Sequence, residues 1–259
     1  MEASIFRIPL PDDYEGSVAA TLVRFAAGRA PSRAVLYLHG YVDYFFQTHM
    51  ARWFVARGWS FYALDLRKYG RSLEAGQTPY YCRDLHEYYP EIDRSIERIV
   101  LMGHSTGGLL ASLYASDGRR RADIERLILN SPFFEFNASW FKRRVAVPVA
   151  AVLGRLWPYA HKKNELSPFY FDSVYRGARG EWDFDTQWKP RDGVPLYFIW
   201  LGAIRKAQRR LRRGLGLRIP VLVLSSADSC RAKTWNDCFR SADAVLNVAD
   251  IRRYAGCLG

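Results

Sequence analysis

Short apolar runs alternate along the chain with longer segments in which apolar residues recur at helical spacing. Each run is bounded by turn residues and is nearly continuous, which is typical of parallel strands buried on both faces. The runs are 33–39 (RAVLYLH), 60–65 (SFYALD), 99–103 (IVLMG), 127–130 (LILN) and 219–225 (IPVLVLS). The candidate helices are 48–57, 84–94 with a kink at Pro90, 106–115 and 248–254. This order predicts an α/β fold, a mostly parallel sheet with helices on both faces, opened by an antiparallel pair at 4–9 and 21–25.

The alternation stops between residues 135 and 215, where the chain is rich in Trp, Tyr, Phe and Arg, and it resumes at residue 219. An aromatic-rich insertion between two sheet strands is typical of a cap that covers a site at the strand ends. We therefore predict a core formed by residues 1–134 and 216–259 and a cap or lid formed by residues 135–215. In the alternative, the inserted helices only pack on the edge of the sheet.

The composition narrows the class of protein. The chain has 259 residues, of which 49% are hydrophobic, 15% aromatic and 25% charged. This balance excludes disordered, collagen-like and low-complexity proteins. No apolar run reaches the length of about 18 residues that spans a bilayer, and the first residues do not resemble a secretory leader. We therefore expect a cytoplasmic protein.

The net charge of +12 is concentrated near the end of the predicted cap. The basic residues there are Arg205, Lys206, Arg209, Arg210, Arg212, Arg213 and Arg218. Trp200, Ile204, Ala207 and Leu211 recur at intervals of four, three and four, which predicts an amphipathic helix. Its basic face is either simply solvated or in contact with anionic lipid or a phosphate-bearing substrate. We expect no nucleic acid as a partner, because no nucleic-acid motif accompanies the charge.

The four cysteines are Cys82, Cys230, Cys238 and Cys257. They are too few for a disulfide scaffold, and no C-x-x-C pair is present. We expect reduced, structural thiols. No metal and no cofactor are predicted.

The strongest chemical signal is Gly103-His104-Ser105-Thr106-Gly107, which lies between the apolar run 99–103 and a helical segment. A G-x-S-x-G sequence in a strand–turn–helix setting is typical of a nucleophile elbow. Glycines allow the tight turn that projects a serine Oγ at the end of the strand. Ser105 is therefore the candidate nucleophile, with Gly103 and Gly107 as the turn residues. The alternative is a glycine-rich turn in which the serine is incidental.

A serine nucleophile needs an oxyanion hole, usually the N–H of the next residue and a second N–H from the loop after an earlier strand. Thr106 supplies the first N–H. The run 33–39 is followed by Gly40 and Tyr41, so the N–H of Tyr41 is the second candidate, and Gly40 lets the backbone turn inward. His39 is interpreted as a structural turn residue rather than a base.

Five segments in this order resemble the α/β-hydrolase superfamily: LYLHGYVDYFFQTHMA, YALDLRKYGRS, LMGHSTGGLLASLYA, LNSPFF and PVLVLSSADS. The similarity is to the branch of monoacylglycerol lipases, lysophospholipases and serine aminopeptidases. The resemblance implies the fold of that superfamily, Ser105 as the nucleophile, and a structural role for Asp65. It also implies Asp228, in the turn after run 219–225, as the catalytic acid. Alternatively, Asp228 forms only an Asx turn or a helix cap.

The general base is missing from the expected place. α/β-Hydrolases present nucleophile, acid and histidine in that chain order, but no histidine follows Asp228. The five histidines are His39, His49, His86, His104 and His161, and strand alternation predicts that His104 points away from the nucleophile. We expect a C-terminally truncated hydrolase that lacks its last strand and histidine loop, with severely reduced turnover. A non-catalytic relative is the alternative.

Together these observations predict a serine hydrolase of carboxylic esters with a Ser-Asp-His mechanism whose histidine is absent from this chain. The aromatic-rich cap favours a small lipid-like substrate such as a monoacylglycerol or lysophospholipid. Two alternatives stay open, which are a non-catalytic binding protein of the same fold and a serine aminopeptidase-type hydrolase.

Overall fold

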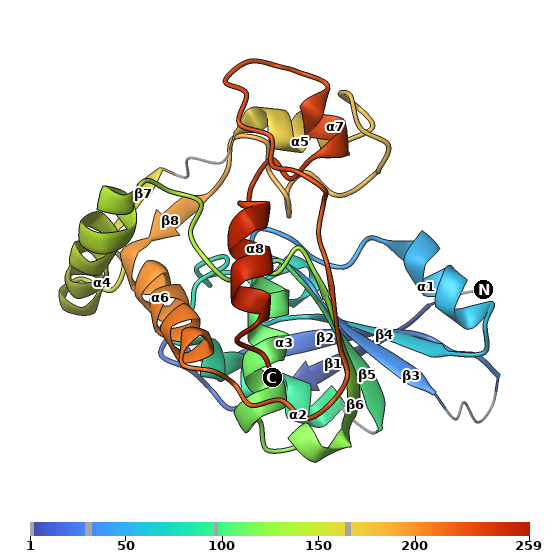
Figure 1. Cartoon of the computed structure of the whole chain (residues 1–259). Coiled ribbons are helices and arrows are strands. Elements are labelled where there is room, and N and C mark those ends of the chain that lie inside the picture. The colour runs from blue at the N-terminus through green and yellow to red at the C-terminus, as the bar shows by residue number, and fades with distance from the viewer. Residues whose placement is uncertain (1–2, 29–32, 96–97, 164–166) are drawn as a thin grey trace.

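A seven-stranded sheet forms the centre of the computed structural model, which describes residues 3–28, 33–95, 98–163 and 167–259 (Figure 1). The strands follow the spatial order β1-β2-β4-β3-β5-β6-β9. They are β1 (Ser4–Pro9), β2 (Ala19–Phe25), β3 (Ala34–Leu38), β4 (Ser60–Asp65), β5 (Ile99–His104), β6 (Ile124–Asn130) and β9 (Val221–Leu224). β1, β2 and β4 pair antiparallel, and all the other pairs are parallel. The predicted mostly parallel sheet and its antiparallel opening pair are confirmed.

Alternate residues of each central strand enter two separate cores. On β3, Val35 and Tyr37 pack in a cluster with α1 (Thr48–Val55), whereas Leu36 and Leu38 pack in the larger cluster with α3 (Thr106–Asp117). β3 is therefore apolar at every position, and helices cover both faces of the sheet, as predicted. The remaining helices of the larger face are α2 (Tyr89–Ser95), α6 (Phe198–Arg212) and α8 (Val248–Ala255).

The segment predicted as one kinked helix at 84–94 is divided at Tyr89. A 3₁₀ turn over Leu85–Tyr88 leads into α2, in which Pro90 occupies the first turn. Proline is tolerated there because the N–H groups of the first turn have no partner within the helix. Two further 3₁₀ turns cover Gly70–Ser72 and Arg121–Asp123.

Residues 135–215 add no strand to the central sheet within the described part of the chain. They form a π-helical turn (Lys142–Ala146), α4 (Val147–Leu156), α5 (Pro168–Val174), α6 and a separate antiparallel pair, β7 (His161–Lys163) and β8 (Pro195–Tyr197). The predicted amphipathic helix is α6, and its apolar stripe (Trp200, Ile204, Ala207 and Leu211) is buried in the core shared with α3. The boundaries of the cap stay a prediction.

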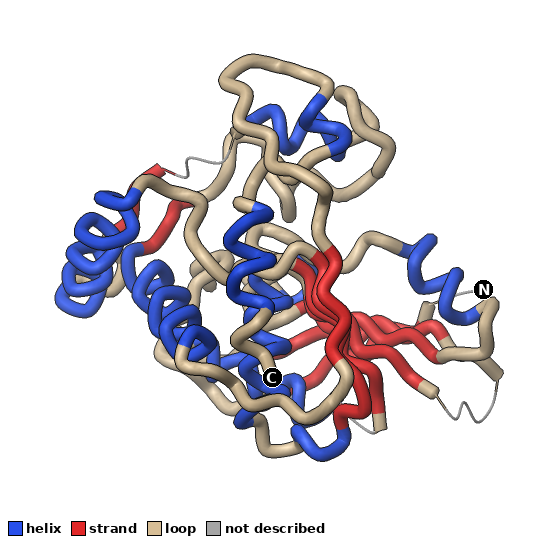
Figure 2. The backbone as a smooth tube through the Cα atoms, in the orientation of Figure 1, coloured by secondary structure: helices blue, strands red, loops and turns tan. Residues whose placement is uncertain are grey.

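The segment after β9 is mostly loop, interrupted by the short helix α7 (Cys238–Ser241), which lies beside α5 (Figures 1 and 2). Within it Cys230 and Cys238 form a disulfide, so the expectation of four reduced cysteines is wrong for this pair. The two residues are eight positions apart, and the loop folds back on itself to bring them together. Cys82 and Cys257 are free. None of the described helices is both long and apolar enough to cross a bilayer.

Candidate active site

Ser105 occupies the sharp turn between β5 and α3. Its φ of 53° and ψ of −116° are strained for a residue with a side chain, and such strain is typical of a nucleophile elbow. A Cβ on Gly103 would lie 2.4 Å from the Gly107 carbonyl oxygen, and a Cβ on Gly107 would lie 2.3 Å from that of His39. Both positions therefore require glycine, because the turn presses directly against the neighbouring backbone.

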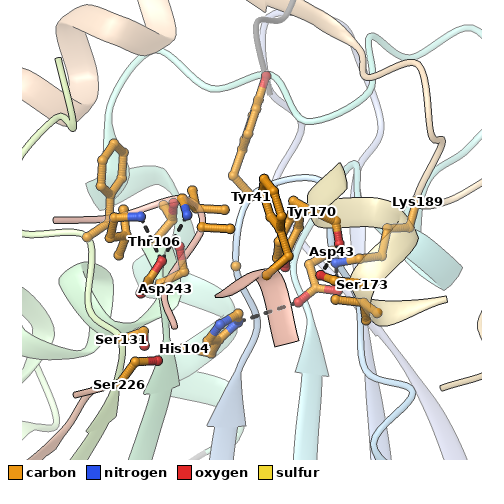
Figure 3. A pocket seen from close by; sticks show the side chains of 18 of the residues that line it. Tyr41, Asp43, His104, Thr106, Ser131, Tyr170, Ser173, Lys189, Ser226 and Asp243 are labelled. Atoms are coloured by element: carbon orange, nitrogen blue, oxygen red, sulfur yellow. Dashed lines mark hydrogen bonds and ion pairs between the residues drawn. The ribbon is translucent and has the colours of Figure 1, made fainter. Parts of the chain in front are cut away.

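A cavity of about 750 Å³ opens at the carboxyl ends of β3, β5 and β6, beside Ser105 (Figure 3). It is lined both by the core and by the predicted cap. Its apolar wall consists of Phe133, Phe136, Val174, Leu196, Trp200, Leu201, Phe239, Val245 and Leu246. Its polar residues include Asp43, His104, Ser131, Tyr170, Ser173, Arg179, Lys189, Arg240 and Asp243.

The two predicted oxyanion donors, Tyr41 and Thr106, both line this cavity. Neither backbone N–H donates a hydrogen bond to another described residue. Gly40 brings the loop close to the elbow, because a Cβ there would lie 3.2 Å from the Ser105 Cβ. The structure thus brings Ser105, Tyr41, Thr106 and Gly40 together.

The structure does not bring Asp228 into this group. Asp228 is exposed and does not line the cavity. Asp243, fifteen residues later, does line it, and its Oδ1 accepts hydrogen bonds from the N–H groups of Val245 (2.9 Å) and Leu246 (2.7 Å). Sequence reasoning missed Asp243, although its tripeptide Ser-Ala-Asp repeats that of Asp228.

His104 lines the same cavity as Ser105, so the prediction that it points away from the nucleophile is wrong. Strand alternation does not extend through the elbow, where the positive φ of Ser105 redirects the chain. The His104 Nδ1 lies 3.6 Å from Asp43 Oδ2. Its ring is therefore turned toward Asp43 (Figure 3).

Asp43 and Lys189 form a buried ion pair in the cavity wall, with Asp43 Oδ1 3.0 Å from Lys189 Nζ. Burial alone would raise the pKa of Asp43, but the Lys189 ammonium and the His104 ring outweigh it and hold that pKa well below its usual value. Burial likewise opposes the charge of Lys189, whose pKa is nevertheless raised by Asp43 and Tyr170. Both groups are therefore charged at neutral pH, and they fix residue 189 of the predicted cap to the core.

The other histidines lie outside the cavity. His39 is buried, with Nδ1 2.8 Å from the Gly40 oxygen and Nε2 accepting from the Leu66 N–H, which agrees with its structural interpretation. Burial lowers the pKa of His39. His161, on β7, is exposed. Among the described residues, no group of three or more His, Cys, Asp or Glu side chains is arranged to hold a metal ion.

Asp65 is buried and organises the loops behind the cavity. Its Oδ1 accepts from the Phe45 N–H at 2.8 Å, and its Oδ2 pairs with Arg71 at 2.7 Å. These contacts fit the structural role that the resemblance implies.

A family model described as serine aminopeptidase, S33, matches residues 29–229, which is most of the chain. The chain belongs to this α/β-hydrolase family. A monoacylglycerol lipase of Mycolicibacterium smegmatis is 34% identical over 139 residues, which cover 49% of this chain and 47% of the lipase. The match thus spans about half the length of that relative.

Two solved structures share the fold of this α/β-hydrolase. A soluble variant of monoglyceride lipase from Saccharomyces cerevisiae aligns with a TM-score of 0.65 over 96% of this chain and 82% of its own, at 15% identity. The monoacylglycerol lipase of Paleococcus ferrophilus aligns with a TM-score of 0.65 over 90% of this chain and 82% of its own, at 20% identity. At these identities the alignments establish the fold alone.

Proposed function

We propose that this α/β-hydrolase is a serine hydrolase of carboxylic esters with an apolar acyl chain. The observation that carries the proposal is Ser105, which stands at a strained elbow beside a cavity with two backbone N–H groups that donate to no other described residue. A strained serine beside such donors is the arrangement that acyl transfer requires.

In the proposed reaction, the Ser105 Oγ attacks the ester carbonyl carbon, and the N–H groups of Tyr41 and Thr106 stabilise the oxyanion. A histidine accepts the serine proton and then gives it to the leaving alcohol. Water releases the acyl group by the reverse sequence, which regenerates the serine. The resemblance places this histidine after the acid in chain order, and no histidine occurs in residues 229–259.

For the catalytic acid, the proposal favours Asp243 over Asp228. An acid that orients a histidine beside the nucleophile has to face the same cavity. Asp243 lines that cavity and is held by two backbone N–H groups, whereas Asp228 is exposed. Asp228 stays the alternative that mutation decides.

The cavity wall supports a lipid-like substrate. Its aromatic and aliphatic side chains suit an acyl chain, and the related lipase from M. smegmatis is named for monoacylglycerol. Arg179 and Arg240 also line the cavity and would suit the phosphate of a lysophospholipid. Asp43 is a poor site for a peptide amino terminus, because Lys189 already neutralises it.

Labelling with a fluorophosphonate probe tests the proposal in a chain extended by the histidine-bearing segment that the resemblance implies, because residues 229–259 contain no histidine that could activate Ser105. We expect one labelled site at Ser105, and no labelling of Ser105→Ala, because the probe reacts with an activated serine and mimics the acyl-enzyme. Ser112→Ala is the matched control, since Ser112 is a buried serine of α3 bonded to the Gly108 oxygen. An unlabelled wild-type chain, or labelling that persists in Ser105→Ala, contradicts the proposal and favours a binding protein of the same fold.

Substrate class is measured separately, with a monoacylglycerol, a lysophospholipid and an aminoacyl anilide of matched size. Hydrolysis of either lipid, but not of the anilide, is the expected result. Preferential hydrolysis of the anilide would instead support the aminopeptidase alternative.

The proposal also includes contact with anionic membranes through the basic side chains at α6. These are Arg205, Lys206, Arg209, Arg210, Arg212 and Arg213. The structure divides them, because Lys206 pairs with Asp84 and Arg212 pairs with Glu135.

A further inference from the structure

The outer face of α4 carries an unusual set of exposed apolar side chains. Val149, Val152, Leu153 and Leu156 are spaced at intervals of three, one and three, so they share one face of the helix. We call these four residues the α4 stripe. Leu156 is 64% exposed, and Trp157, which follows it, is 61% exposed. Trp140, Phe141, Val145 and Tyr159 extend the apolar surface on either side.

The opposite face of α4 is already occupied by α6. A Cβ on Gly154 would lie 2.3 Å from the Ile199 nitrogen, and one on Gly202 would lie 3.2 Å from the Ala151 Cβ. The two helices therefore meet through small residues, with α4 on the outside of α6 (Figure 1). The α4 stripe is left facing outward. The segment 139–163 around it contains six Lys or Arg residues and no Asp or Glu.

A groove of about 440 Å³ between α3, α4 and α6 adjoins this surface. We call it the basic groove, after its six cationic side chains: Arg155, Arg205, Lys206, Arg209, Arg210 and Arg213. Its acids are Asp84 and Asp117, but Asp84 is engaged by Lys206 and His86, and Asp117 accepts from the Tyr89 hydroxyl.

Five of the six cations in the basic groove lack an acidic partner among the described residues, and only Lys206 has one. Within the described part of the chain, no carboxylate lies within ion-pair distance of Arg155, Arg205, Arg209, Arg210 or Arg213. Burial, together with the like charges of Arg209, Arg212 and Arg144, lowers the pKa of Arg205. The groove therefore holds uncompensated positive charge, which an anion would relieve.

We propose that the basic groove binds the phosphate of an anionic membrane lipid while the α4 stripe inserts between the acyl chains of the same leaflet. The pairing of the two surfaces identifies the ligand as a lipid, since a free phosphate would leave the stripe exposed and a nucleic acid would not cover it. Arg155 joins the two surfaces, because it lines the groove and precedes Leu156 on α4. This inference extends the proposed action on lipid esters, which would place the hydrolase at the membrane that holds its substrate.

Cosedimentation with vesicles tests the proposal, using phosphatidylcholine alone and phosphatidylcholine mixed with phosphatidylglycerol. We expect the wild-type chain and Ser105→Ala to bind the mixed vesicles equally and to bind phosphatidylcholine weakly. The double variant Arg205→Gln/Arg209→Gln should bind the mixed vesicles about thirtyfold less well, because each cation near an anionic surface contributes about fivefold. Arg52→Gln/Arg57→Gln, at exposed positions on α1 and in the turn after it, removes the same charge elsewhere and should leave binding unchanged.

A second pair of variants tests the insertion of the α4 stripe into the leaflet. Val152→Ser/Leu156→Ser should lower binding to mixed vesicles at least tenfold, because two side chains no longer enter the hydrocarbon. Ile5→Ser/Phe6→Ser, at exposed positions of β1, is the control. Since all these residues are on the surface, an unchanged unfolding temperature verifies that each variant is folded.

Three results overturn the proposal. The first is equal binding to both vesicle types or no effect of Arg205→Gln/Arg209→Gln. The second is release from vesicles by inorganic phosphate beyond that caused by chloride of equal ionic strength, which would assign the groove to free phosphate. The third is binding of a DNA duplex that the same double variant abolishes while vesicle binding is unchanged. Intact vesicle binding by a chain whose Ser105 resists labelling would overturn the proposed hydrolase activity alone.

Discussion

The tripeptide Ser-Ala-Asp occurs twice after β9, at 226–228 and at 241–243, and the two copies have different environments. The first copy follows the strand directly and ends in the exposed Asp228. The second copy begins at the last residue of α7 and ends in Asp243, which lines the cavity beside Ser105. Identical local sequence therefore gives one solvent-facing carboxylate and one at the candidate active site.

The two copies lie side by side, because the loop between them folds back. The backbone N–H of Asp243 donates to the backbone carbonyl of Asp228 at 2.9 Å, and the backbone N–H of Cys230 donates to the backbone carbonyl of Asp243 at 2.8 Å. The disulfide between Cys230 and Cys238 closes the same loop. The tripeptide thus indicates which segment of the chain supplies the candidate acid, whereas the path of the loop decides which carboxylate lines the cavity.

The largest expected effect separates the two aspartates. In a chain extended by the histidine-bearing segment that the resemblance implies, Asp243→Asn should slow fluorophosphonate labelling of Ser105 by about 10²- to 10⁴-fold, the range for loss of an acid that supports a general base. Asp228→Asn is the matched control and should leave the rate unchanged, because an exposed side chain outside the cavity contacts no reacting group. A slow Asp228→Asn variant beside a normal Asp243→Asn variant would reverse the assignment.

The elbow could be predicted from sequence because its constraints are local. Gly103, Ser105 and Gly107 lie within five positions, and Gly103 is required by contact with the Gly107 carbonyl inside the motif, although Gly107 is required by contact with the His39 carbonyl after β3. The central strands were equally clear, since burial on both faces makes long stretches of them apolar. The acid could not be placed in this way, because its position depends on how a loop of irregular structure closes.

The ion pair between Asp43 and Lys189 could not be predicted from the sequence either. Its partners are 146 positions apart, and no periodicity or motif relates a lysine of the insertion to an aspartate after β3. His104 was misplaced for a related reason, since strand alternation was extended into a turn that breaks it. Apart from the loop at Gly40 and Tyr41, which the hydrolase motif relates to the elbow, contacts between distant segments could not be predicted.

A third carboxylate, Asp43, differs from both aspartates because it is buried and already paired with Lys189. Lys189→Met should lower the free energy of unfolding by about 3–5 kcal/mol at pH 7, because it leaves the buried Asp43 without its counter-ion. Lys206→Met, which breaks an exposed pair with Asp84, should cost less than about 1 kcal/mol. Urea unfolding measures both, and equal losses would contradict the buried ion pair.

The pH dependence of this pair follows from the direction of its pKa shifts. The depressed pKa of Asp43 stabilises the fold above the unfolded value of about 3.9, and this stabilisation is lost as pH falls below it. In Lys189→Met the unpaired Asp43 should instead take up a proton more readily. The deficit of the variant should therefore shrink between pH 7 and pH 5, and a constant deficit would show that packing, not charge, causes it.

The smallest expected effect concerns the disulfide that holds the two Ser-Ala-Asp copies together. Cys230→Ser/Cys238→Ser should lower the free energy of unfolding by about 2–3 kcal/mol, the amount expected when so short a loop is no longer closed in the unfolded chain. Cys257→Ser, which removes a free thiol, is the control. Labelling of Ser105 should slow by less than about tenfold, because the backbone hydrogen bonds between the copies remain and Asp243 keeps its two N–H donors. A loss of labelling as large as that of Asp243→Asn would mean that the crosslink, rather than the local hydrogen bonds, positions this carboxylate.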